Sequence, residues 1–115
     1  MDANVSWIDQ LLAGRPITAR DTVRSEDGAI SIRIPKFDGK FLGRYLQPRL
    51  KQPFFHLKLD ELGAFVWEHC DGSLTGDEIV AAMQERFPDA VNVRDRVALF
   101  LRLLVGQKHV ELRAP

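Results

Sequence analysis

The chain has 115 residues, and its 16 basic residues are balanced by 16 acidic ones. An apolar content of 45% in a chain of this length predicts one compact domain with a core of its own. The zero net charge argues against a nucleic-acid-binding protein, because such proteins carry an excess of basic residues that neutralises phosphates.

The cysteine content and the spread of apolar residues predict a cytoplasmic protein. A single cysteine, Cys70, cannot form an internal disulfide, which fits a reducing compartment. The N-terminus is acidic, and no apolar run reaches the roughly 18 residues that a membrane span needs. We therefore expect no signal peptide, no membrane span and no membrane partner.

Residues 1–20 are expected to form an N-terminal extension with a short amphipathic helix. Its apolar residues recur at helical spacing: Trp7, Ile8, Leu11 and Leu12. Gly14 is a suitable stop for such a helix. Because so short a helix is marginal in isolation, we expect it to dock on the domain formed by residues 21–115.

Three strands in an antiparallel meander are predicted before the main helices. An Asp27-Gly28 turn joins Asp21–Arg24 to the alternating segment Ala29–Ile34, and Pro53–Leu59 is the third strand. Side chains of the third strand alternate between two faces, with Phe54, His56 and Lys58 on one and Phe55, Leu57 and Leu59 on the other. As the last strand of the sheet, it has N–H and C=O groups that need protection or can pair with another chain.

Charge is distributed unevenly along the chain. The connection 36–52, part of which is expected to be helical before Pro48, carries five basic residues and one acidic residue. Residues 60–89 carry eight acidic residues and one basic residue. A basic flank beside a strand edge can attract an acidic peptide, whereas the alternative is that both segments are simply solvated surfaces.

Two capped helices are predicted between Asp60 and Pro88. Asp60 has the character of an N-cap, and Asp71-Gly72 ends the first helix. Thr75 and Glu78 have the spacing of a capping box at the start of the second. Each helix has an apolar side, composed of Leu62, Phe65, Val66, His69 and Cys70 in the first and of Ile79, Val80, Met83 and Phe87 in the second.

A third helix is predicted from the N-cap Asn92 to Val105, with Gly106 in the left-handed position that closes many helices. Its core stripe consists of Val97, Phe100, Leu101, Leu104 and Val105. Leu99 and Leu103 fall outside this stripe, so the helix has a second apolar side. The region beside the third strand, the N-terminal extension or a second subunit could cover that side. A short strand, His109–Leu112, is expected to follow as a wing.

The central residues resemble the PqqD-like family. The resemblance is carried by Leu59-Asp60-Glu61-x-Gly63-x-Phe65-Val66-Trp67-Glu68-x-Cys70-Asp71-Gly72 and by Thr75-x-x-Glu78-Ile79. It implies a winged-helix-like α+β domain, in which an N-terminal three-stranded antiparallel sheet precedes a three-helix bundle and a short C-terminal strand. Residues 1–20 and the connection 36–52 depart from the short form of the family.

The same resemblance implies a noncatalytic adaptor. Members of the family, which is named for pyrroloquinoline quinone biosynthesis, bind the leader of a ribosomally made precursor peptide. They present it to a modifying enzyme, such as a radical S-adenosylmethionine enzyme. We expect the leader to add a strand to the third strand and to press apolar side chains against the third helix. The expected contact residues are Phe54, His56 and Lys58 on the strand and Arg96, Leu99, Phe100 and Leu103 on the helix.

Two other functions remain open at this point. A winged-helix DNA-binding regulator would place the third helix in a major groove, but its three arginines lie among leucines and the preceding helix is acidic. A structural homodimer would bury Leu99 and Leu103 at an isologous contact, which does not exclude peptide binding.

No catalytic, cofactor or metal site is predicted. The histidines, His56, His69 and His109, lie far apart and lack the paired spacing of metal ligands. Cys70 lies on the core side of its helix without an obvious base, so we expect an inert buried thiol. Trp67 is expected to pack at the edge of the core.

Overall fold

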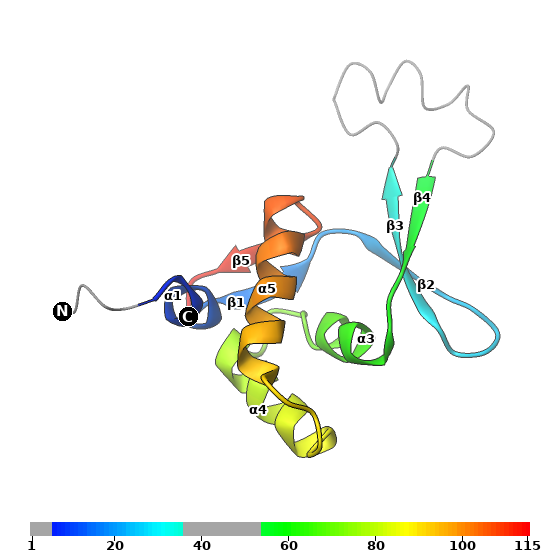
Figure 1. Ribbon diagram of the computed structural model, residues 1–115. Coiled ribbons are helices and arrows are strands. Elements are labelled where there is room, and N and C mark those ends of the chain that lie inside the picture. Colours follow the sequence, from blue (N-terminus) through cyan, green and yellow to red (C-terminus); the bar gives the residue numbers. More distant parts are fainter. Residues whose placement is uncertain (1–5, 36–53) are drawn as a thin grey trace, which may run out of the picture. The chain divides into compact units, whose positions relative to one another are not determined.

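The computed structural model describes residues 6–35 and 54–115. Within these residues the chain is an α+β protein with four helices and five strands (Figure 1), which confirms the predicted class. The chain divides into two compact units, one formed by residues 20–60 and the other by residues 1–19 and 61–115. The predicted helix and basic flank of residues 36–52 lie outside the described residues.

The unit of residues 20–60 contains a three-stranded antiparallel sheet. Its strands are β2 (Asp21–Arg24), β3 (Ile30–Pro35) and β4 (Phe54–Lys58), in the order β2-β3-β4. The predicted meander is therefore confirmed. The turn between β2 and β3 has Gly28 at a φ of 86°, a left-handed conformation that glycine adopts without a Cβ clash.

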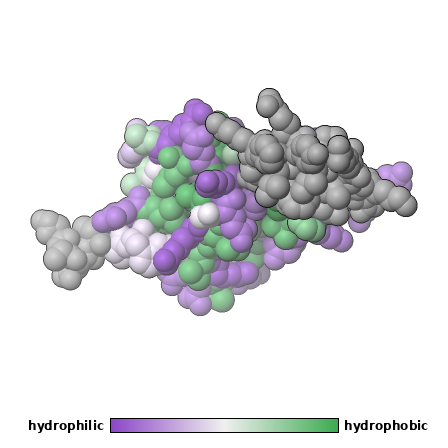
Figure 2. Space-filling model, turned by 90° about the horizontal axis from the view of Figure 1, so that it is seen from above, coloured by the Kyte–Doolittle hydropathy of each residue, from purple (hydrophilic) through white to green (hydrophobic). Residues whose placement is uncertain are grey.

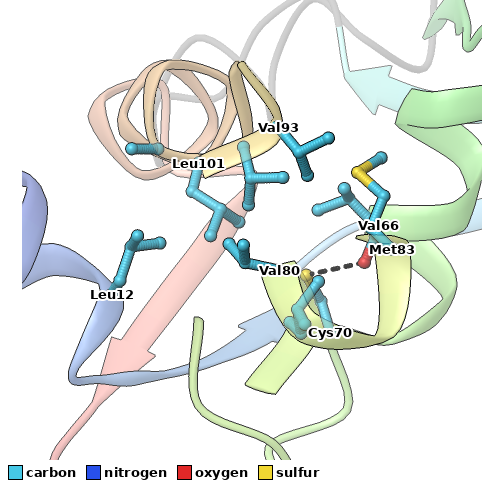
Figure 3. Close-up of a cluster of buried hydrophobic side chains, with 10 residues drawn as sticks. Leu12, Val66, Cys70, Val80, Met83, Val93 and Leu101 are labelled. Carbon is cyan, nitrogen blue, oxygen red and sulfur yellow. Dashed lines mark hydrogen bonds between the residues drawn. The ribbon is translucent and has the colours of Figure 1, made fainter. Parts of the chain in front are cut away.

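The other unit combines helices with a two-stranded sheet. Its elements are α1 (Trp7–Leu12), β1 (Arg15–Thr18), α3 (Glu61–Glu68), α4 (Gly76–Arg86), α5 (Val93–Gly106) and β5 (Val110–Arg113). Buried side chains of the four helices form one apolar cluster (Figure 3), which includes Leu12 from α1, Val66 from α3, Val80 and Met83 from α4, and Leu101 from α5. The N-terminal helix expected from the sequence is thus present and packs into the core.

Residues 14–19 contain a strand that the sequence analysis did not predict. β1 pairs in antiparallel fashion with β5, and on its other side the Thr18 N–H donates to the Cys70 carbonyl at 2.9 Å. The strand β5 lies close to the expected final strand, His109–Leu112. That strand was expected to form a wing, whereas β5 pairs with β1 of the N-terminal segment. The expected division into an extension, residues 1–20, and a domain, residues 21–115, stays a prediction.

The helix boundaries are close to the expected ones. Of the two expected N-terminal caps at α4 and α5, one is confirmed and the other has a different geometry. The predicted capping box at the start of α4 is confirmed, since Glu78 N–H donates to Thr75 Oγ1 and Thr75 N–H donates to Glu78 Oε1. Asn92 precedes α5 as expected, yet its φ of 53° is left-handed and its side chain makes no capping hydrogen bond.

The expectation that Gly106 closes α5 in a left-handed conformation is wrong. The left-handed residue is Lys108, at a φ of 64°, two positions further along the chain. Its N–H donates to the Val105 carbonyl at 3.0 Å, and the next N–H, from His109, donates to the Leu104 carbonyl at 2.8 Å. These are the two bonds of a Schellman motif, which satisfies carbonyl groups at the helix end.

Among the described residues, no helix combines the length and the apolar character that crossing a membrane would require.

A close approach of Leu12 to Gly76 fixes α1 against the start of α4. A Cβ on Gly76 would lie 2.7 Å from a side-chain carbon of Leu12 and 2.8 Å from its Cα. The Gly76 N–H also donates to the Gly14 carbonyl at 2.9 Å. Since Leu12 is fully buried, this contact joins the N-terminal segment to the core.

Replacing Gly76 by alanine is expected to lower the free energy of unfolding by about 1–3 kcal/mol, because the added methyl group overpacks the contact with Leu12. Urea denaturation followed by circular dichroism measures the change. Gly106→Ala is the matched control, because apart from its chain neighbours and the backbone of its own helix no atom lies within 4 Å of the added carbon there. The control is expected to unfold at the same or a slightly higher urea concentration. Equal destabilisation by both substitutions would contradict the role given to the Leu12 contact.

Candidate functional site

Strand β4 lies at one end of the three-stranded sheet, and its backbone groups point alternately toward and away from β3. The Leu59 N–H donates to the Ile30 carbonyl at 2.9 Å, so this residue pair is hydrogen-bonded. In an antiparallel ladder every second pair is of this kind. The backbone groups of Leu57 and Phe55 therefore face β3, and those of Phe54, His56 and Lys58 face outward.

The outward groups of β4 are available for pairing as far as the described residues show. The sheet order β2-β3-β4 places no strand of residues 6–35 or 54–115 on the outer side of β4. Three N–H and three C=O groups thus form a row along one edge. A row of this kind is a template on which another extended chain can form a strand.

The side chains of β4 give its two faces different chemistry. On one face, His56 stands opposite Arg33 of β3, and Lys58 stands opposite Ser31. The Arg33 guanidinium forms an ion pair with Asp21 at 2.7 Å and lies 4.8 Å from the centre of the Phe54 ring. On the other face, the side chains of Phe55 and Leu57 are 57% and 41% exposed.

The second set of expected site residues lies on α5. Leu99 and Leu103 are 57% and 54% exposed, which confirms that this helix has an apolar side outside the core. Arg96 lies on the same helix and donates to the Val91 carbonyl at 3.4 Å, and Phe100 is half-buried. On the face of the molecule seen in Figure 2, hydrophobic side chains lie among hydrophilic ones.

Helix α1 docks on a different side of α5 from Leu99 and Leu103. Arg94 forms an ion pair with Asp9 of α1, and the Arg102 guanidinium lies 4.6 Å from the centre of the Trp7 ring. Positions 94 and 102 are eight residues apart and so lie on one side of a helix. The N-terminal extension was one of three expected partners for the exposed leucines, and its described residues leave them uncovered.

Ionic contacts also hold α1 in place. Arg94 Nε lies 3.6 Å from Asp77 Oδ1, so the Arg94 guanidinium forms ion pairs with acidic residues of both α1 and α4. The hydrogen bond from Arg94, assisted by its charge, holds the pKa of Asp9 below its ordinary value. The carboxylate of Asp9 therefore stays charged at pH values where an isolated aspartate begins to take up a proton.

Replacing Arg94 by glutamine is expected to raise the pKa of Asp9 toward its ordinary value, because the charged donor is lost. A carbon-detected NMR titration of the Asp9 carboxyl group measures it. A lowered pKa means that the Arg94–Asp9 pair stabilises the fold above the ordinary aspartate pKa, and that this stabilisation is lost as the pH falls through the folded-state value. An Asp9 pKa that is the same in both proteins would contradict the ion pair.

The seven expected contact residues are brought together in two sets, each within its own unit. Phe54, His56 and Lys58 share one face of β4 and its outward backbone groups, while the four helical residues are spaced along α5. Arg33 was not among the residues expected from the sequence, and it joins the β4 set through the β3–β4 register. The alternation of β3 and the meander would have placed Arg33 beside His56 if the register had been known.

Cys70 has the environment of a core residue. Its thiol donates to the Val66 carbonyl at 3.1 Å (Figure 3), and burial, together with the charge of Asp71, raises its pKa to about 12. The thiol is therefore protonated at neutral pH and is not a nucleophile. Trp67 is 2% exposed, which confirms its expected place in the core.

Two of the three histidines are engaged within the fold. His69 stacks on Phe65 with ring centres 4.3 Å apart, and its Nδ1 lies 2.7 Å from the Phe65 carbonyl oxygen. His109 is buried at the end of α5, whereas His56 is exposed on β4. Among residues 6–35 and 54–115, no three histidine, cysteine, aspartate or glutamate side chains are grouped so that they could hold a metal ion.

Comparison with known proteins gives a match to the middle and C-terminal part of the chain. Residues 56–110 match the family model described as Coenzyme PQQ synthesis protein D (PqqD). The chain is 37% identical over 57 residues to a protein of Stutzerimonas stutzeri (strain A1501) named PqqA binding protein. It is 40% identical over 58 residues to proteins of the same name from Klebsiella pneumoniae (strain 342) and Kluyvera intermedia.

These alignments are partial for both partners. Each covers 50% of this chain and 62% or 63% of the relative. The chain therefore spans less than two thirds of the length of the curated relatives that it matches. The matched segment includes α3, α4 and α5 and three residues of β4. No solved structure matches the chain.

Proposed function

We propose that this chain, which is PqqD-like over residues 56–110, is a noncatalytic adaptor that binds the leader of a ribosomally made precursor peptide. The relatives are named for binding PqqA, so a peptide of that kind is the proposed ligand. The adaptor would present the bound peptide to a separate modifying enzyme, such as a radical S-adenosylmethionine enzyme. It would act in the cytoplasm and without a cofactor, a metal ion or a catalytic residue of its own.

The observation that carries this proposal is the outer edge of β4. The outward N–H and C=O groups of Phe54, His56 and Lys58 can form a ladder with an extended peptide, whatever its side chains. Side chains on both faces of β4 then supply selection. A binding mode of this kind needs an accessible backbone edge with varied side chains around it, and β4 offers both.

We include in the proposal the four residues of α5 predicted from the sequence. Leu99 and Leu103 are apolar and more than half exposed, and Phe100 and Arg96 lie on the same helix. We propose that Arg96, Leu99, Phe100 and Leu103 contact a further part of the peptide. Strand addition alone is tolerant of sequence, so a second apolar surface would add selectivity.

The arginines of α5 favour this function over DNA binding. Arg94 is paired with Asp9 and Asp77, Arg102 lies over Trp7, and Arg96 donates to a backbone carbonyl. A recognition helix in a winged-helix regulator must present such side chains to bases and phosphates. Leu99 and Leu103 are exposed beside these arginines, so α5 offers a partner an apolar surface as well as charged groups.

Replacing His56 by proline is expected to weaken binding of the precursor peptide encoded beside this protein by about tenfold, because an outward N–H is lost and a peptide carbonyl is left without a donor. Proline is tolerated on an edge strand when its nitrogen faces away from the sheet. Isothermal titration calorimetry measures the affinity, and circular dichroism verifies the fold.

The matched control is His56→Thr, which removes the imidazole but keeps the N–H. It is expected to bind within about threefold of the wild-type affinity, since only one side-chain contact changes. If the threonine and proline variants bound the peptide equally, backbone pairing at β4 would be the wrong mode. If the folded wild-type protein bound no precursor peptide, the proposed function itself would be wrong.

Replacing Leu103 by glutamate is expected to weaken peptide binding at least tenfold without changing the free energy of unfolding by more than about 0.5 kcal/mol, because this side chain is exposed in the free protein. Val91→Glu is the matched control, since Val91 is a 68% exposed apolar residue outside the proposed site.

The same pair of variants tests the homodimer alternative. If Leu103→Glu, but not Val91→Glu, abolished a concentration-dependent increase in sedimentation coefficient while leaving peptide affinity unchanged, the exposed side of α5 would be a subunit interface.

A further inference from the structure

We propose that β4 selects an extended peptide in which acidic and apolar side chains alternate. The inference rests on the proposed function and specifies the class of peptide that the edge of β4 would accept. It follows from the pairing directions of β4 and from the different chemistry of its two faces. No property of the rest of the peptide is needed.

The direction of the β4 backbone groups sets which peptide side chain meets which face. A peptide residue directly opposite His56 or Lys58 projects its side chain on the same face as those two residues, because opposite residues on neighbouring strands share a face. The residues before and after it project on the face of Phe55 and Leu57. This alternation holds for a parallel and for an antiparallel peptide.

The face of His56 and Lys58 is basic where a peptide would lie. Neighbouring strands are about 4.8 Å apart, so an added strand lies one spacing from Lys58 and two from Arg33. Arg33 already forms an ion pair with Asp21 at 2.7 Å, so these two charges largely cancel each other for a peptide carboxylate. The basic character of this face therefore rests on Lys58.

Lys58 is available to such a carboxylate. Among the ion pairs of the described residues, none includes its ammonium group. Asp27, in the turn between β2 and β3, is within electrostatic range of Lys58, and its carboxylate accepts hydrogen bonds from the Ser25 hydroxyl and the Ala29 N–H without forming an ion pair with Lys58. A peptide glutamate or aspartate on this face would pair with Lys58.

The opposite face favours apolar peptide side chains. Phe55 and Leu57 are large apolar residues that are 57% and 41% exposed, and their neighbours across β3 are Ile34 and Ile32. An apolar side chain on an added strand would continue this row and remove exposed apolar surface from water. A charged side chain at the same position would be desolvated there without a partner.

A second copy of this chain fits the same edge less well. Pairing of β4 with β4 of another molecule would place the basic side chains of both strands on one face of the joined sheet. Like charges on neighbouring strands are destabilising. A peptide with alternating acidic and apolar side chains would replace this repulsion by attraction on the face of Lys58. It would keep the apolar contact on the face of Phe55 and Leu57.

Three synthetic octapeptides of the same length and fluorescent label test the inference in an anisotropy titration with the full chain. The first alternates glutamate and valine, the second has the same composition in the order Glu-Glu-Val-Val repeated, and the third alternates lysine and valine. We expect the first to bind at least tenfold more tightly than either of the others. In the Lys58→Glu variant the third should bind more tightly than the first.

Lys108→Glu is the matched control, because it makes the same change of charge at an exposed lysine outside β4. It should leave the order of the three affinities unchanged. Equal affinities for the first two peptides, or an order that Lys58→Glu does not reverse, would overturn the alternating pattern. If the precursor peptide still bound and His56→Pro still weakened it, the proposed function would stand; if no peptide bound, both would fail.

Discussion

Satisfaction of backbone hydrogen bonds is the constraint on which this structure depends. In the helical unit, side chains or neighbouring segments complete the pairing at several exposed ends. Thr75 and Glu78 cap the start of α4, the turn at Lys108 closes the end of α5, and β1 is bonded to β5 on one side and to residues 70–72 on the other. At β4, as at β2 and β5, the strands of the described residues supply a sheet neighbour on one side alone. Of these three edges β4 is the one with exposed large apolar side chains, Phe55 and Leu57, so we place the added strand there.

Helix α5 shows how one helix can serve a core and a surface together. Val97, Leu101 and Leu104 are buried. Arg94 and Arg102 contact Asp9 and Trp7 of α1. Leu99 and Leu103 lie outside both of these contacts and remain exposed. The docking of α1 therefore stabilises the helical unit while leaving the second apolar side of α5 accessible. In our proposal, peptide binding does not require α1 to leave its position.

Much of the fold could be read from local signals. The Asp27-Gly28 turn, the alternation of β3 and β4 and the Thr75–Glu78 capping box each specify structure within a few residues, and each is confirmed. The resemblance of the central residues to the PqqD-like family is also confirmed, over residues 56–110. For the candidate site, alternation assigned Phe54, His56 and Lys58 to one face, and helical periodicity separated Leu99 and Leu103 from the core stripe. These inferences succeeded because backbone periodicity is a local property.

The remaining features depend on partners that are distant in sequence. The short segment Arg15–Thr18 becomes a strand because β5 and residues 70–72 lie on its two sides, and its own composition gives no such signal. The left-handed turn at Lys108, and not at Gly106, follows from the hydrogen bonds that close α5. Arg33 joins the β4 face only through the register of β3. The sequence by itself determined where the helices and the strands of the β2-β3-β4 meander lie and which side chains share a face. Only the tertiary structure decided that β1 pairs with β5 and with residues 70–72 and which register β3 takes, because such pairing depends on backbone groups that carry no side-chain signal.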